Sequence, residues 1–195
     1  MANTQGNASA KPTYLGLLNA ISLAETRAGR YLEAWAEATD DEDLASTLRL
    51  VAARERSHGE VFCRRLAELG YALRPKADPE AQKRLAKVAD PAVSDLEKVG
   101  PQRPQGADPF ADICARIESG EYDPMTASLL TWYIAEERDS AARLDTAFDG
   151  VRRKANGAGS ATGAPGADAQ AIMACMTAGF ARLEKPMEKL AKSLR

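Results

Sequence analysis

The chain of 195 residues is long enough to bury one hydrophobic core and short enough to form a single domain. Its 26 basic and 28 acidic residues give a net charge of −2, so no strong field of one sign favours nucleic acid or an anionic membrane as a partner. No apolar run reaches the roughly 18 residues of a membrane span, and residues 1–11 lack the apolar segment of a secretory signal. We therefore expect a cytoplasmic protein with no nucleic-acid or membrane partner.

Prolines and capping residues divide the chain into helical segments. Residues 1–11 have the composition of a disordered tail, and residues 12–195 are predicted to form one domain. Four long helices are predicted, over residues 12–39, 43–69, 124–153 and 167–193. Between the second and the third, residues 71–123 contain six prolines, so only short helices are expected there, near 79–89 and 108–118.

The lengths of the connections predict how these helices assemble. Short links join the helices within each pair, whereas residues 71–123 separate the two pairs. We therefore expect an all-α fold, a four-helix bundle with one long crossover between its second and third helices. Glycines inside the helices indicate that helices approach closely, within the bundle or at the helix faces of a homodimer; they are Gly16, Gly29, Gly59 and Gly179.

Three of the long helices carry a carboxylate in the middle of an apolar face. Apolar residues recur there with alternating spacings of four and three, and Glu25, Glu55 and Glu137 each occupy one of these inward positions. Each glutamate lies about twelve residues into its helix, so all three are expected at the same depth. A buried carboxylate costs several kcal/mol unless it is paired or bound to a metal, so a positive group is predicted between them.

The second helix adds the protein's single histidine at the same level. Glu55-x-x-His58 places a carboxylate and an imidazole one turn apart on one helix face. Carboxylates combined with imidazole suit iron best, and can also hold manganese or zinc. The alternative is a metal-free polar layer, in which the seam carboxylates pair with arginines of neighbouring helices; the candidates are Arg54, Arg56, Arg64, Arg65 and Arg138.

These residues resemble a known superfamily. Residues 18–70, through Glu25 and the stretch AARERSH at 52–58, resemble the first half of a ferritin-like or rubrerythrin-like domain. Residues 123–144, with AEERDS at 135–140, resemble a helix of the second half. The resemblance implies a di-iron carboxylate centre in which Glu25 and His58 are terminal ligands, Glu55 is a bridge and Glu137 is a ligand from the other half.

The chain also departs from that family. A second E-x-x-H is missing, because the predicted helix at 167–193 offers neither carboxylate nor imidazole at mid-length. The stretch 135–140 matches 53–58, with Ser140 in the place of His58. If residues 124–153 take the role of the fourth helix, then 108–118 is a truncated third helix and Glu118 is its candidate ligand.

Two further residues next to Glu137 are candidates for a role at the centre. Glu136 is a candidate substitute ligand, although its helix face is less apolar than that of Glu137. Tyr133, one turn before Glu137, is interpreted as a core aromatic or as a residue that hydrogen-bonds a ligand or relays an electron.

The sequence therefore leaves two alternative functions open. The first is an oxidoreductase or iron- and peroxide-handling protein with a carboxylate metal centre of one or two ions. The second is a ferritin-like helical scaffold that has lost its metal. The sequence identifies neither a substrate nor an electron donor.

Overall fold

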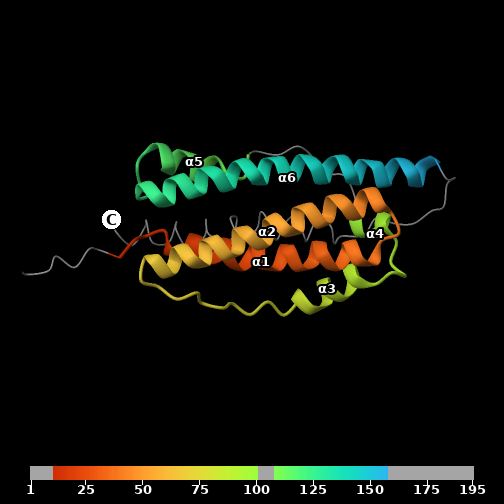
Figure 1. Cartoon of the computed structure of the whole chain (residues 1–195), viewed down its shortest axis with the longest axis horizontal. Helices are drawn as coiled ribbons and strands as arrows, with labels where there is room; N and C mark the ends of the chain where they lie inside the picture. The colour runs from red at the N-terminus through yellow and green to blue at the C-terminus, as the bar shows by residue number, and fades with distance from the viewer. Residues whose placement is uncertain (1–10, 101–107, 158–195) are drawn as a thin grey trace, which may run out of the picture.

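The computed structural model describes residues 11–100 and 108–157, and every structural statement below refers to those residues. Within them the chain forms six helices and no strands, so the all-α class is confirmed for this part of the chain (Figure 1). The predicted tail, the helix predicted at 167–193 and therefore the four-helix count lie outside the described residues. None of the described helices is long and apolar enough to cross a membrane.

Three long helices form the body of the described part of the chain. They are α1 (Leu15–Ala38), α2 (Glu42–Glu68) and α6 (Pro124–Gly157), each within a few residues of its predicted bounds. A short link makes α1 and α2 an antiparallel pair, and α6 lies along α2 (Figure 1). Ion pairs join opposite ends of α2 and α6, Lys154 with Asp41 at 2.7 Å and Arg65 with Asp123 at 2.8 Å, so these two helices are also antiparallel.

Aspartates define where the second and third long helices begin. The Asp41 carboxylate accepts a hydrogen bond from the backbone N–H of Leu44 at 3.3 Å and caps α2. Asp123 caps α6 by accepting from the N–H of Thr126 at 3.1 Å. It also accepts from the Tyr14 hydroxyl of the α1 N-cap at 2.5 Å, so one carboxylate ties the start of α6 to the start of α1.

The described residues between α2 and α6 form three short helices. The expected helix at 79–89 is α3 (Ala81–Ala89), which begins later because Pro79 and the following residue form a turn over the Asp78 carboxylate. The helix expected at 108–118 is α5 (Ala111–Glu118). The third, α4 (Asp95–Val99), was not predicted; its N-cap Ser94 accepts a hydrogen bond from the N–H of Glu97 at 3.2 Å.

Side chains of this segment enter the core. Val88 of α3 and Val99 of α4 are buried against one end of the long helices. Phe110 and Ile113, at and just after the start of α5, are buried against the other end. The connection therefore covers the outside of the long helices and also contributes apolar surface to their interior.

The core consists of two apolar clusters separated by a polar layer. One cluster surrounds the stacked rings of Trp35 and Phe148, whose centroids lie 5.4 Å apart. The other surrounds the edge-to-face pair of Phe62 and Tyr133, at 5.1 Å. Along each long helix, the residues between the two clusters include the buried glutamates. The glutamates therefore lie where apolar side chains above and below exclude water.

Two glycines bring α1 and α2 together at this layer. A Cβ atom on Gly59 would lie 3.1 Å from the Thr26 backbone nitrogen, and one on Gly29 would lie 3.0 Å from the Ala52 carbonyl oxygen. The Ser22 hydroxyl also donates a 2.7 Å hydrogen bond to the Gly59 carbonyl across the contact. The predicted close approach is thus realised within the chain at these two glycines. It is not found at Gly16, where no atom of the described part of the chain lies within 4 Å of an added Cβ, and Gly179 lies outside the described residues.

We expect Gly59→Ala to lower the free energy of unfolding by about 1–3 kcal/mol, because the new methyl group has no room against α1. Gly16→Ala is the matched control, since no atom lies within 4 Å of its added Cβ and alanine favours helix by up to about 1 kcal/mol. Urea denaturation of both variants measures the difference. Equal stability of the two variants would contradict the tight contact.

Candidate metal centre

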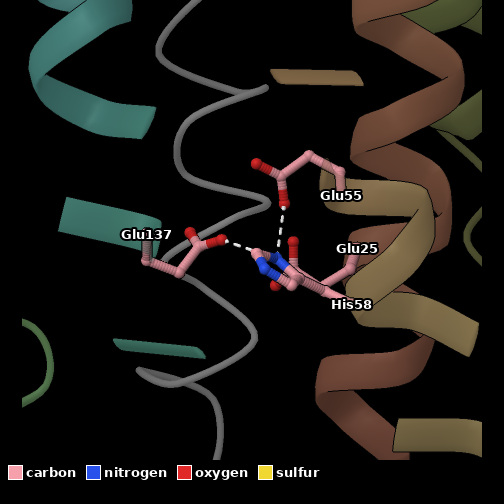
Figure 2. A group of neighbouring side chains, drawn as sticks. All are labelled: Glu25, Glu55, His58 and Glu137. Atoms are coloured by element: carbon pink, nitrogen blue, oxygen red, sulfur yellow. Dashed lines mark ion pairs between the residues drawn. The ribbon is translucent and has the colours of Figure 1, made fainter. Parts of the chain in front are cut away.

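Four buried side chains from three helices meet in the polar layer (Figure 2). Glu25 comes from α1, Glu55 and His58 from α2, and Glu137 from α6. Each offers one ligand atom, and these atoms all lie within 4.8 Å of one another. The structure therefore brings together the four residues that helix register and depth predict, whereas metal binding by them stays a prediction.

The imidazole of His58 lies between carboxylates. Its Nδ1 is 3.1 Å from Glu137 Oε1 and 3.6 Å from Glu55 Oε2, so this nitrogen faces the cluster. Its Nε2 lies 2.9 Å from Glu136 Oε2 on the other side. Because the Glu136 side chain is 32% exposed, the structure places this candidate ligand behind the imidazole, between the cluster and solvent.

Aromatic rings fix the position of the imidazole and of one carboxylate. The rings of Trp132 and Tyr133 meet His58 edge to face, with centroids 5.1 Å and 5.0 Å away. The fully buried Tyr133 hydroxyl donates a 2.7 Å hydrogen bond to Glu25 Oε1. Of the roles considered for Tyr133, the structure therefore supports a core aromatic that also hydrogen-bonds a candidate ligand.

The two remaining candidates have different positions. Ser140 is fully buried on α6, and its hydroxyl oxygen lies 3.3 Å from Arg54 Nη1, which donates to it. Glu118 is exposed at the end of α5, and the structure does not place it in the cluster. The face of α5 that turns inward carries Ile113, so the last residue of this short helix points elsewhere.

Four of the five arginine candidates pair with acidic residues outside the cluster. These ion pairs, at 2.5–2.8 Å, join Arg54 with Asp139, Arg56 with Glu33, Arg65 with Glu68 and Asp123, and Arg138 with Asp108. None of them reaches the three glutamates of the cluster. Ion pairs with arginine within the described residues therefore do not account for the buried carboxylates.

Several buried oxygen and nitrogen atoms of the cluster make no hydrogen bond to the described residues. They are Glu25 Oε2 and both carboxylate oxygens of Glu55, together with His58 Nδ1 and Glu137 Oε1, which contact each other as an ion pair at 3.1 Å. A buried polar atom without a partner costs about 1–3 kcal/mol, and more when it is charged. Because one ligand atom of each of the four side chains lies within 4.8 Å of the others, the arrangement favours a cation as their common partner.

Burial and mutual repulsion make the cluster bind protons. Burial, followed by the neighbouring Glu55, holds the pKa of Glu25 well above its usual value. Burial likewise raises the pKa of Glu55 to about 8, with the charge of Glu137 adding to the effect. For His58, burial opposes protonation, but the carboxylates of Glu137 and Glu136, at 3.1 Å and 2.9 Å from its nitrogens, outweigh it and raise the pKa. A metal ion bound here would therefore displace protons at neutral pH.

Comparison of the chain with models of known families, with characterised proteins and with solved structures finds no match. The geometry of the cluster is therefore the basis for any functional conclusion.

Raising the pH from about 5 to about 8 is expected to destabilise the metal-free protein. Above the usual carboxyl pKa of 4.5, the unfolded chain has released protons that the folded protein still holds on Glu25 and Glu55, so stability falls as the pH rises. The raised pKa of His58 acts in the same direction, because its stabilising contribution is lost as the pH rises through the folded-state pKa.

Urea denaturation of chelator-treated protein across this range measures the effect. We expect the free energy of unfolding to fall by more than about 1.4 kcal/mol, the equivalent of one pKa unit. Glu55→Gln, which keeps the shape of the side chain but cannot ionise, should flatten the profile. A stability that rises between pH 5 and pH 8 would contradict the protonation scheme.

Proposed function

We propose that this protein binds a divalent transition metal at Glu25, Glu55, His58 and Glu137 and uses it in oxidative chemistry. The observation that carries the proposal is that four buried side chains each offer one ligand atom within 4.8 Å of the others, while several of their oxygens make no hydrogen bond to the described residues. Ionised carboxylates cannot donate hydrogen bonds to one another, whereas one cation can contact all four side chains.

The donor set favours particular metals. Three carboxylates and one imidazole form a hard, oxygen-rich site of the kind that suits iron or manganese, and zinc is also compatible with it. Iron is the preferred candidate, and when bound it would supply the redox chemistry for oxidation by dioxygen or peroxide. The three carboxylates together offset the charge of a divalent ion and leave the layer negative.

Residues around the cluster prepare it for a metal. Glu136 accepts a hydrogen bond from His58 when Nε2 carries the proton, and this leaves the Nδ1 lone pair directed at the carboxylates. Tyr133 holds one oxygen of Glu25 and leaves the other directed at the cluster. The two apolar clusters keep bulk water out of the layer, which strengthens its electrostatic interactions.

A ferritin-like four-helix bundle is the fold we propose for the whole domain. It is supported by the antiparallel α1–α2 pair, the long connection and the carboxylates shared between α1, α2 and α6. The contact between Glu55-x-x-His58 and the α6 stretch that contains Ser140 supports the alignment in which α6 is the partner of α2 in metal binding.

A metal-free scaffold is the second candidate, and one observation favours it. His58 lies within 3.1 Å of Glu137 and 2.9 Å of Glu136, and its pKa is raised. A protonated imidazole between two carboxylates would partly neutralise the layer without a metal. This arrangement leaves both oxygens of Glu55 without a hydrogen bond, which is why we prefer the metal centre.

Metal analysis decides between the two functions. We expect protein purified without chelator to contain a transition metal by mass spectrometry, and the metal-depleted protein to bind Fe(II) or Mn(II) in calorimetric titrations. His58→Ala should lower this affinity on the order of 100-fold or more, because it removes the only imidazole of the chain.

Leu66→Ala on the same helix is the matched control for loss of buried volume. It should lower stability by about 2–5 kcal/mol while leaving metal affinity near that of the original protein, because Leu66 belongs to the apolar cluster. Failure of the unmodified protein to bind any of these metals would favour the scaffold, and unchanged affinity in His58→Ala would exclude His58 as a ligand.

A further inference from the structure

The α2 and α6 parts of the cluster are related by an approximate twofold axis. On α2, Glu55 is followed three residues later by His58, and on α6, Glu137 is followed three residues later by Ser140. All four side chains are buried. The two helices are antiparallel, so Glu55 and His58 of α2 face the equivalent pair of α6. In this equivalence Glu137 corresponds to Glu55, and Ser140 corresponds to His58.

The residue that precedes each glutamate completes this symmetry. Glu136, before Glu137, reaches across to His58 Nε2 at 2.9 Å. Arg54, before Glu55, reaches across to Ser140 Oγ at 3.3 Å. The buried polar side chain of each helix is therefore contacted from behind by a charged side chain of the other helix.

The charged side chains in the two equivalent contacts have opposite signs. His58 Nε2 contacts a carboxylate, and this contact favours an imidazole whose other nitrogen can bind a cation. Behind Ser140 stands a guanidinium, which remains positively charged at any physiological pH. Asp139 is shared between Arg54 at 2.6 Å and Arg143 at 2.7 Å, so this group of three keeps a net positive charge.

Arg54 precedes the cluster residue Glu55 on α2, so its positive charge lies next to the cluster. The Arg54 side chain lies mostly below the surface, because only 24% of it is exposed and its guanidinium contacts the fully buried Ser140.

We infer that the cluster holds one divalent cation, on the His58 side, and that Arg54 supplies on the Ser140 side the positive charge that a second cation would otherwise bring. This inference rests on the proposed metal-binding function and fixes its stoichiometry. The Ser140 side has no imidazole to act as a metal ligand, because His58 is the only histidine of the chain. The Ser140 hydroxyl oxygen already accepts a hydrogen bond from Arg54, and the guanidinium would repel a second divalent ion.

The inference is tested by exchanging one half of the site for the other. The double variant Arg54→Glu, Ser140→His gives the second half the same residue types as the first. We expect the unmodified protein to bind one equivalent of Mn(II), with the electron paramagnetic resonance spectrum of isolated ions. The double variant should bind two equivalents with the spectrum of a spin-coupled pair. Arg49→Glu, the same change at an exposed position of α2, is the control and should bind one.

Each result separates the inference from the proposed function. Failure of the unmodified protein to bind either Mn(II) or Fe(II) would reject the metal-binding function. Two tight equivalents in the unmodified protein, or one equivalent in a folded double variant, would overturn the inference while leaving that function intact. Should circular dichroism show the double variant to be unfolded, Arg54→Gln replaces it. We expect it to admit a second, weaker equivalent, and a stoichiometry of one would overturn the inference.

Discussion

Burial of three carboxylates at one level of an apolar helix assembly is the constraint on which the rest of this structure depends. Each buried carboxylate costs several kcal/mol unless it is compensated, so the surrounding residues must hold the layer in place against its own repulsion. The glycine contact between α1 and α2, the Tyr133 hydroxyl and the carboxylate behind His58 all act at this level. The apolar clusters on either side supply the stability that tolerates such a layer.

The sequence predicted the cluster because helix register and depth are both readable from spacing. A glutamate in an inward position is directed at the core whatever the crossing angle, and equal depth then brings Glu25, Glu55 and Glu137 together. Some side chains lie beside the inward face, and their contacts depend on how the helices cross. The spacing of residues in the sequence gives no crossing angle. For this reason the position of Glu136 behind His58 and the contact of Arg54 with Ser140 emerged only from the structure.

The connection between α2 and α6 shows a different limit of sequence reasoning. Its prolines correctly excluded a long helix, but they did not indicate that Val99 and Phe110 would be buried. The short helix α4 carries a recognisable signal, since Ser94 and Glu97 have the spacing of a helix-capping pair. Glu118 was a candidate ligand only through the alignment that makes residues 108–118 a truncated third helix. With an exposed side chain at the end of α5, it illustrates why register is the stronger criterion.

The position of Trp132 makes its fluorescence sensitive to the state of the cluster. This indole is 38% exposed on α6 and meets the His58 ring edge to face, whereas the other tryptophan, Trp35, is fully buried and donates a hydrogen bond to Asp95. A charged imidazole or a paramagnetic ion next to an indole quenches its fluorescence. The emission of Trp132 therefore reports the state of a site that is itself shielded from solvent, and Trp35 provides an internal reference in the same molecule.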